Sequence, residues 1–277
     1  DEAWSLLGDG GGSAKVLAGG QSLVPMLKLR FASPEMLVDI NGLPDLAYHR
    51  RDADGSIHIG ALARHAHLER SSVLAEYQPT MAACARLVAD PVVRNRGTLV
   101  GSLCHAYPQG DWASVMLSLD GYVVALSPRG RRTIAVRDFV NGPFQNALAY
   151  DEIAIEAVVP TPKGTPAGGY LKLERRVGDF ATAGVAVSVD RVGGSVVRAG
   201  IALTGVGAST IPADEAAGIL VGSALSADRI AEAADLAASV AEPNSDHRGS
   251  ADYKRHLIRV FTSRILTQLL DTAEEAA

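Results

Sequence analysis

The 277-residue chain has few of the residues that build metal centres. It contains two cysteines, Cys84 and Cys104, and they form no C-x-x-C pair. An iron–sulfur cluster is held by about four thiolates, so this chain cannot hold one by itself. The seven histidines show no metal-binding spacing, because His65 and His67 lie two apart in a predicted helix and point to different sides. The sequence therefore predicts no metal site.

Other absences narrow the class of protein. The net charge of −5 argues against a nucleic-acid-binding protein, which usually has a basic face. No apolar run approaches the length of a membrane span, and the acidic start DEAWSLLGDG lacks the basic region of a secretory signal. We therefore expect a cytoplasmic protein with no nucleic-acid partner. No G-x-G-x-x-G follows a predicted strand, so a Rossmann nicotinamide site is not supported.

Before residue 160 the pattern alternates short helices and strands without an internal repeat. The predicted helices cover 2–7, 23–30, 63–70, 72–88 and 111–119, and the predicted strands cover 15–18, 36–40, 45–49, 56–60, 121–127, 131–136 and 152–159. Pro79 is expected to break the helix over 72–88 in two. Residues 90–110 show no periodicity and are predicted to form a long loop, a feature that is usually functional or disordered.

The segment TPKGTPAGG at 161–169 is rich in proline and glycine and predicts a linker. The pattern of predicted elements changes after it. Three β-rich runs follow, with a hairpin turn at 192–195, and predict a three-stranded antiparallel sheet. The runs are 169–176, 182–191 and 195–206, followed by helices at 213–221, 226–241 and 250–272. Strands followed by helices are typical of an α+β domain. We expect domains over 1–165 and 166–277, the first with subdomains of about 1–55 and 56–165.

The last predicted helix carries an apolar face that has two interpretations. Its members are Leu257, Val260, Phe261, Ile265, Leu269 and Leu270. They fall on one side at helical spacing. The face fits either the internal core or a subunit interface, with 253–259 the more exposed part.

Residues 15–30, KVLAGGQSLVPMLKLR, read as a strand, a glycine turn and a helix N-terminus. Gly19 and Gly20 allow the backbone to come close to a ligand. The free N–H groups and partial positive charge of a helix N-terminus suit a diphosphate. Many strand–helix turns carry two glycines without a ligand, so a plain turn is the alternative for this segment taken alone.

Two further segments carry similar signals. In RNRGTLVGSLCHAYPQGD, at 94–111, small residues and hydroxyls again offer backbone N–H groups to an anion. Asp111 there is either the N-cap of the next helix or a carboxylate that binds sugar hydroxyls. In YLKLERRVGDFATAGVA, at 170–186, Lys172 and Phe180 suit a phosphate and a flat ring. A basic strand followed by a turn is the alternative.

Together these three segments resemble, in order and spacing, the FAD-binding medium subunit of the molybdenum hydroxylases. The resemblance is closest to the medium subunit of aerobic carbon monoxide dehydrogenase, in a family that includes the flavin portions of xanthine dehydrogenase. It covers essentially the whole chain, including GSADYKRHL at 249–257. It implies a two-part FAD-binding domain of the PCMH type, as in the vanillyl-alcohol-oxidase-like flavoproteins, followed by a smaller C-terminal domain.

The resemblance also implies non-covalent FAD and the residues that bind it. AGGQS at 18–22 matches the first diphosphate loop, and TLVGS at 98–102 matches the second, usually T-I-G-G-S. Asp111 matches a carboxylate beside ribose or ribityl hydroxyls, Lys172 a flavin-contacting lysine and Phe180 an aromatic against the isoalloxazine. Val88 matches a position near the adenine, with a core role as the alternative. The implied set is Lys15, Leu17, Ala18, Gly19, Gly20, Gln21, Ser22, Leu23, Val88, Thr98, Gly101, Ser102, Asp111, Lys172 and Phe180.

Four residues depart from the family pattern. Val100 replaces the first glycine of the second loop, and its side chain is expected to narrow the approach of the backbone and to disfavour positive φ. Gln21 stands where His is frequent, and Tyr107 where Asp is common. Cys104 stands where Ala is common, and is read as a small packing residue rather than a redox thiol.

The implied function is electron transfer within a complex. A large subunit would oxidise the substrate at a molybdenum–pterin centre, and a small subunit would relay electrons through two [2Fe–2S] clusters to FAD on this chain. An external acceptor such as a membrane quinone would then be reduced, in a dimer of heterotrimers that associates with the inner face of the cell membrane. No catalytic side chain is expected here, because the cofactor carries the chemistry.

Carbon monoxide is the favoured substrate of the large subunit, and an aromatic N-heterocycle, a purine or an aldehyde is the alternative. Two other classes stay open on the sequence. One is a stand-alone FAD oxidoreductase with its own substrate pocket. The other is an interaction subunit that has lost FAD, to which only Val100 points.

Overall fold

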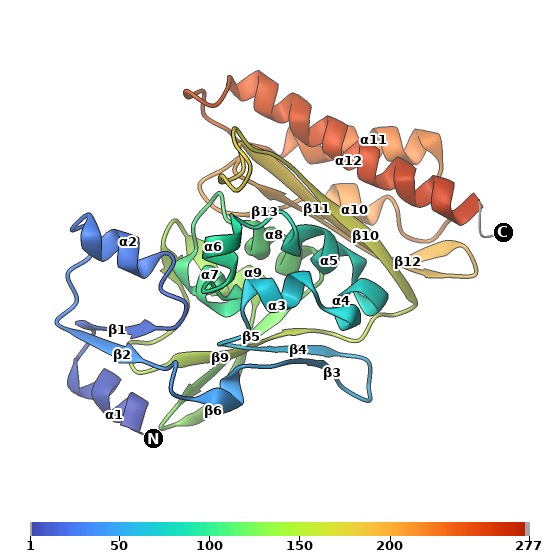
Figure 1. Cartoon of the computed structure of the whole chain (residues 1–277). Coiled ribbons are helices and arrows are strands. Elements are labelled where there is room, and N and C mark those ends of the chain that lie inside the picture. The colour runs from blue at the N-terminus through green and yellow to red at the C-terminus, as the bar shows by residue number, and fades with distance from the viewer. Residues whose placement is uncertain (1, 275–277) are drawn as a thin grey trace.

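The computed structural model describes residues 2–274, and the chain begins with a small βαβ unit (blue in Figure 1). Strands β1 and β2 pair in parallel, from Ala14 opposite Met36 to Leu17 opposite Asp39. Leu7 packs under this pair in a small separate core, whereas no residue of α2 is buried. The elements are α1 (Glu2–Asp9), β1 (Ala14–Leu17), α2 (Leu23–Lys28) and β2 (Met36–Asp39).

A five-stranded antiparallel sheet follows, in the order β3-β4-β9-β5-β6. The late strand β9 lies between β4 and β5, so the sheet joins distant parts of the chain. The strands are β3 (His49–Arg51), β4 (Ile57–Gly60), β5 (Tyr122–Ser127), β6 (Gly130–Ala135) and β9 (Ile153–Val159). The strand predicted over 45–49 is wrong, because Pro44 opens the short 3₁₀ helix η1 (Pro44–Leu46) and β3 begins only at His49.

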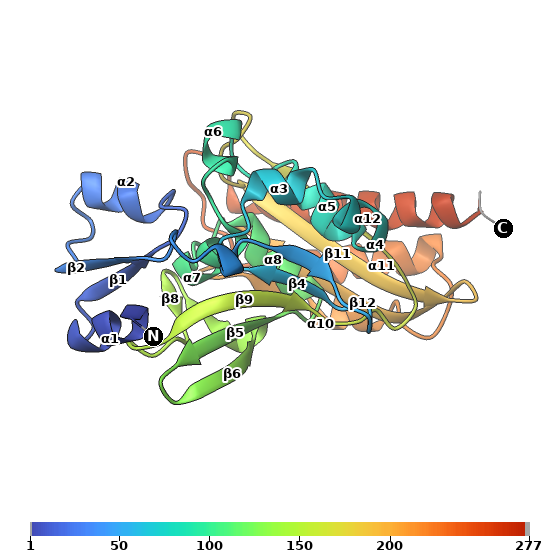
Figure 2. The same ribbon diagram turned by 60° about the horizontal axis from the view of Figure 1, so that its bottom comes forward.

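Short helices lie between this sheet and the C-terminal sheet (Figure 1, and turned by 60° in Figure 2). Every residue of α8 is buried, and Trp112 within it is fully enclosed. The helices are α3 (His65–Glu69), α4 (Ser72–Tyr77), α5 (Pro79–Ala85), α6 (Pro91–Arg94), α7 (Leu99–His105), α8 (Asp111–Ser118) and α9 (Val136–Phe139), and the hairpin of β7 (Val140–Gly142) and β8 (Gln145–Asn146) follows them. The predicted break at Pro79 is confirmed, because Pro79 starts α5.

The C-terminal sheet has four antiparallel strands in the order β10-β11-β12-β13, so the predicted number of three is wrong. The fourth strand holds only two residues and has no alternating pattern of its own. It is formed by pairing with Ala202 and Leu203 of β12. The elements are β10 (Thr165–Leu173), β11 (Ala183–Val192), β12 (Ser195–Thr204), β13 (Ile211–Pro212), α10 (Asp214–Gly218), α11 (Ala227–Ser239) and α12 (Ala251–Glu274).

The apolar face of α12 belongs to the core of this C-terminal part. Leu257, Phe261 and Ile265 are buried and pack with the valines of β11. The core interpretation of that face is therefore the one that the fold adopts. No helix within residues 2–274 is both long and apolar enough to span a membrane.

Two segments that were predicted to be irregular contain regular structure. Residues 90–110 hold α6 and α7, whose starts are capped by the side chains of Asp90 and Thr98. Caps of this kind create short helices without any long-range periodicity. The predicted linker over 161–169 is partly strand, because β10 begins at Thr165 and pairs with Arg191.

Candidate functional site

The first glycine loop, residues 18–22, leaves β1 and enters α2. Gly20 has φ of +75°, a left-handed conformation that glycine adopts without strain. Among the hydrogen bonds of the described chain, none is donated by the backbone N–H groups of residues 19–23. Ser22, the N-cap of α2, makes no side-chain cap bond. A run of free N–H groups at a tight turn is a cradle for an anion.

The second loop, residues 96–102, opens α7. The hydroxyl of Thr98 accepts a hydrogen bond from the N–H of Gly101 at 3.1 Å and so fixes the first turn. A Cβ on Gly101 would lie 2.7 Å from that hydroxyl, which explains the glycine. Val100 is right-handed helix and 2 % exposed, with its side chain in the core. The predicted narrowing of the loop by Val100 is therefore wrong, because the side chain points away from the loop surface.

The two glycine loops touch through their backbones. A Cβ on Gly19 would overlap the carbonyl oxygen of Arg96 and lie 2.8 Å from the Cα of Gly97. Only a residue without a side chain allows this approach. The fold thus brings together two segments about 80 residues apart, as a shared diphosphate site requires.

Asp111 and Lys172 form a buried ion pair rather than lying free at the surface of the site. The Lys172 ammonium donates to Asp111 Oδ2 at 3.1 Å, and the Tyr170 hydroxyl donates to Asp111 Oδ1 at 2.6 Å. The exposed fractions of the Asp111 and Lys172 side chains are 6 % and 1 %. Burial raises the pKa of the Asp111 carboxyl, and the Lys172 cation opposes that rise. Asp111 is not the N-cap of α8, because Gly110 holds that position.

Aromatic side chains gather around Phe180. The rings of Tyr107 and Phe180 meet edge to face with centroids 4.6 Å apart. Phe144, from the β7–β8 hairpin, lies 5.5 Å from Tyr107, and its N–H donates to the Ala106 carbonyl at 2.9 Å. Phe180 and Phe144 remain 47 % and 53 % exposed. Sequence reasoning missed Phe144, because its contact with Tyr107 joins residues 37 positions apart. Its backbone has a positive φ of +59°, which is uncommon for a residue with a side chain.

Residues 1–162 match the family model of the FAD-binding domain in molybdopterin dehydrogenase, and residues 169–269 match the CO dehydrogenase flavoprotein C-terminal domain. The carbon monoxide dehydrogenase medium chain of Hydrogenophaga pseudoflava is 38 % identical over 265 residues, with 96 % of this chain and 92 % of that one covered. The chain belongs to the FAD-binding medium subunits of the molybdenum hydroxylases. It is therefore an oxidoreductase subunit of a multi-subunit enzyme.

One further relative and one solved structure support this assignment. The alpha subunit of the 6-hydroxypseudooxynicotine dehydrogenase complex of Paenarthrobacter nicotinovorans is 40 % identical over 276 residues, with 99 % and 92 % of the two chains covered. A solved structure of carbon monoxide dehydrogenase from Hydrogenophaga pseudoflava superposes with a TM-score of 0.91 at 39 % identity, covering 96 % of this chain and 92 % of that one. Similarity of this degree shows the family and its fold.

The other expected contacts of the medium subunit lie in different surroundings. Lys15 is exposed on β1, and Leu17 and Leu23 are half-buried beside the first loop. Val88 is 7 % exposed and belongs to the core, as its alternative interpretation held. Burial raises the pKa of the Cys104 thiol to about 12, so it stays protonated at neutral pH and behaves as a packing residue.

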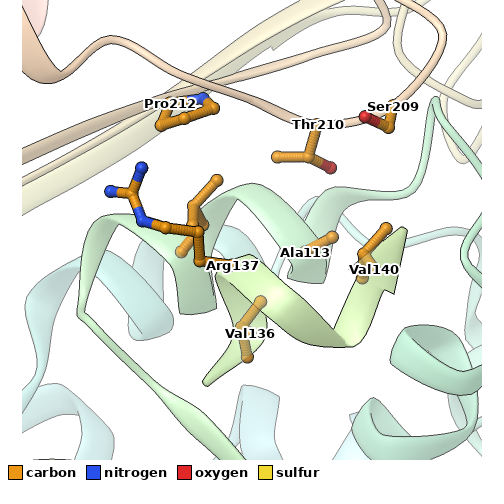
Figure 3. Close-up of a pocket in the computed structure, with 8 residues that line it drawn as sticks. Ala113, Val136, Arg137, Val140, Ser209, Thr210 and Pro212 are labelled. Carbon is orange, nitrogen blue, oxygen red and sulfur yellow. The ribbon is translucent and has the colours of Figure 1, made fainter. Parts of the chain in front are cut away.

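A cavity of about 230 Å³ lies elsewhere, between α8, α9 and the β13 strand (Figure 3). Arg137 stands at its edge and binds Asp214 through two hydrogen bonds of 2.8 Å. None of the predicted site residues lines it, and it is smaller than the usual pocket for a drug-sized ligand. The paired glycine loops therefore remain the candidate site of this medium subunit.

Sequence reasoning also gave no role to His65, which contacts the second loop at Gly97. The ring Nδ1 of His65 accepts a hydrogen bond from Trp112 Nε1 at 3.1 Å, and the backbone N–H of His65 donates to the Gly97 carbonyl at 3.0 Å. Because Trp112 donates, Nδ1 carries no proton and the ring is neutral. Burial, with help from Arg94 and Arg64, lowers the pKa of His65 to about 3.

His65→Gln is expected to flatten the acid side of the stability profile. An unfolded histidine titrates near pH 6.5, whereas folded His65 titrates near 3, so the unfolded chain binds one more proton between these values. The free energy of unfolding should therefore fall by about 1.4 kcal/mol per pH unit as the pH drops below about 6.5. Urea unfolding between pH 7 and 4 measures that slope. His67→Gln, an exposed change two residues on, should keep the full slope, and an equal slope in His65→Gln would contradict the assignment.

Proposed function

We propose that the site holds non-covalent FAD and that this chain is the electron outlet of its complex. Electrons would arrive from the [2Fe–2S] clusters of a small partner subunit and leave to an external acceptor such as a quinone. The observation that carries the proposal is the contact between two glycine loops, one of which offers a run of free N–H groups. When bound, FAD supplies the redox chemistry, because flavins exchange one or two electrons.

The chain's own residues would hold the diphosphate at the centre of FAD and the flavin ring at one end. Residues 18–22 and 98–102 would bind the diphosphate through backbone N–H groups and through the hydroxyl of Ser22 or Ser102. Phe180, already packed against Tyr107, would cover one face of the flavin ring. Lys172 and Asp111 bind each other, so they would act at the edge of the site by fixing the loop at 179–180, whose carbonyl at Asp179 accepts from Lys172 at 3.1 Å.

The chain must depend on partners for the remaining redox centres. Cys84 is buried, and it and Cys104 are the only thiols of the chain. A small iron–sulfur subunit and a large molybdenum–pterin subunit would therefore complete the enzyme, as a cytoplasmic dimer of heterotrimers. The resemblance to the named medium chains supports this composition.

Carbon monoxide is our proposed substrate of the large subunit. Two carbon monoxide dehydrogenase medium chains, at 38 % and 35 % identity, support it. The 40 % identity to a 6-hydroxypseudooxynicotine dehydrogenase subunit favours a second candidate, an N-heterocycle-derived substrate. Dye reduction by the purified complex, with carbon monoxide and with a panel of N-heterocycles, purines and aldehydes, separates the two.

The complex purified through this chain is expected to show the absorption spectrum of an oxidised flavin. Denaturation should release FAD at one molecule per copy of this chain, and mass spectrometry of the native complex should find two further subunits. A colourless complex without FAD would overturn the proposal. Bleaching of the flavin by substrate in the chain alone would instead indicate a stand-alone oxidoreductase.

A further inference from the structure

Arg64 lies between the two glycine loops and has not been assigned to the site so far. It immediately precedes α3 and pairs with Thr98 of the second loop in an isolated antiparallel bridge. Its side chain is half-buried, whereas the nearby side chain of Arg96 is exposed. Its position therefore puts a guanidinium beside both loops.

A chain of three hydrogen bonds links the two loops, and this guanidinium donates two of them. Arg64 Nη1 donates to the Arg96 carbonyl of the second loop at 2.5 Å, and Nη2 donates to Asn41 Oδ1 at 2.5 Å. Asn41 Nδ2 in turn donates to the Ala18 carbonyl of the first loop at 2.8 Å. The first loop follows β1 and the second leads from α6 into α7, so this chain of contacts joins two separate parts of the fold.

Two hydrogen bonds to Asp39 fix the position of Asn41. Its N–H donates to Asp39 Oδ1 at 2.9 Å and its amide donates to the same oxygen at 2.6 Å. The amide orientation follows from these contacts, because only its oxygen then faces the Arg64 donor. Hydrogen bonds to a charged group are stronger than neutral ones, and a planar guanidinium fixes direction as well as distance.

The same arrangement leaves positive charge and free donors at the loops. A guanidinium has five N–H donors, and Arg64 uses two of them in hydrogen bonds to other described residues. Arg64 and Arg96 both lie near the single carboxylate of Asp39. The local balance is one positive charge in excess, which favours an anion between the loops.

We propose that Arg64 is a positioning residue for the dinucleotide: together with Asn41 it sets the spacing of the two glycine loops so that both address one diphosphate. This inference rests on the proposed function, since it assumes that FAD is the ligand. The guanidinium acts chiefly through geometry, by holding the Ala18 and Arg96 carbonyls at a fixed separation. Its charge adds to the attraction for the diphosphate.

The test compares FAD affinity in complexes that carry Arg64→Lys, Arg64→Ala, Asn41→Ala or the double substitution Arg64→Ala/Asn41→Ala. Each complex is stripped of FAD and titrated with FAD and, separately, with ADP, which carries the diphosphate without the flavin. Arg70→Ala, an exposed arginine just beyond α3, is the matched control. Melting of the stripped complexes reports any general loss of folding.

Loss of the bridge is expected to weaken binding of both FAD and ADP roughly tenfold, because two hydrogen bonds to a charged group disappear. Asn41→Ala removes no charge and should give a loss similar to that of Arg64→Ala. The double substitution should be no worse than either single one, since both break the same chain of contacts. Arg64→Lys should recover little, because an ammonium cannot reach both carbonyl-side partners in the guanidinium geometry.

Three outcomes would overturn the inference while FAD binding by the unsubstituted complex stands. Arg64→Lys with full affinity would make the role purely electrostatic, and unchanged affinity in Asn41→Ala would remove the bridge. Additive losses in the double substitution would show two independent contacts. An unsubstituted complex that takes up no FAD would instead overturn the proposed function.

Discussion

Gly19→Ala is expected to strip most of the FAD from the purified complex. The new Cβ would overlap the Arg96 carbonyl oxygen and lie 2.8 Å from the Gly97 Cα, so the two loops must separate. Both obstacles are backbone and cannot rotate away as a flexible side chain can. To bind FAD the loops would have to close again against the strain of overpacking, which is about 1–3 kcal/mol. That strain corresponds to roughly 5- to 150-fold weaker binding. Titration of the stripped complex with FAD, followed by flavin fluorescence, measures the change.

Gly42→Ala is the matched control for this experiment. Gly42 lies in the turn after β2, close to the site in sequence, yet a Cβ there would meet no atom within 4 Å. It should keep the affinity and stoichiometry of the unsubstituted complex. If Gly19→Ala also kept them, the contact between the two loops would have no part in FAD binding.

Lys172→Met is expected to give the largest loss of stability. The Lys172 ammonium lies 3.1 Å from Asp111 Oδ2 and 3.3 Å from Glu174 Oε2, so its removal leaves two carboxylates without their cation. Breaking a buried pair in this way costs about 3–5 kcal/mol, because an uncompensated charge stays in the interior. Urea unfolding at pH 7 of this chain, purified from its complex, measures the loss in the free energy of unfolding.

The acid dependence of that variant follows from the same cause. Burial already raises the pKa of Asp111, and the Lys172 cation opposes that rise. Removal of Lys172 should therefore raise the pKa of Asp111 further. A folded-state pKa above the unfolded one means that the folded chain binds the proton more tightly. The stability deficit of Lys172→Met should therefore shrink as the pH falls from 7 towards 4.

A second substitution separates the charge from the packing. Lys172→Met with Asp111→Asn carries a neutral pair in which the asparagine can still accept from the Tyr170 hydroxyl. It should recover part of the lost stability at pH 7, because Asp111 no longer carries an uncompensated charge while Glu174 still does. Lys163→Met, an exposed change on the same part of the chain, should stay within about 0.5 kcal/mol of the parent. Failure of the double substitution to recover any stability would show that packing, and not the ion pair, makes Lys172 important.

The sequence predicted correctly those elements that depend only on residues next to one another in the chain. The strand, glycine turn and helix over 15–28 follow from an apolar run, two glycines and a helix start, all within one segment. The break at Pro79 follows from the missing N–H of proline. The antiparallel hairpin at 192–195 follows from its two glycines, which take positive φ at Gly193 and Gly194.

Elements that depend on neighbours were missed. The helix α7 has seven residues and begins at a Thr98 cap, so no long apolar period announces it. The β13 strand exists only because β12 offers an edge to it. Val100 was expected to disturb the second loop, and only its place in a buried helix turn shows that its side chain faces the core.

The site shows the same division. From sequence came the ordered glycine motifs, the family that they indicate and the residue types that suit a diphosphate. The pairings came from tertiary structure: Lys172 with Asp111 at a separation of 61 residues, Trp112 with His65 at 47, and Arg64 with Arg96 at 32.

The sequence by itself thus determined the class of protein, because ordered motifs and local backbone preferences are written in short segments of the chain. Tertiary structure alone decided which donors meet which acceptors, since a hydrogen bond depends on the distance between atoms that folding brings together. It turned Asp111 from a free carboxylate into half of a buried pair, and it made Arg64 and Asn41 the link between the two loops.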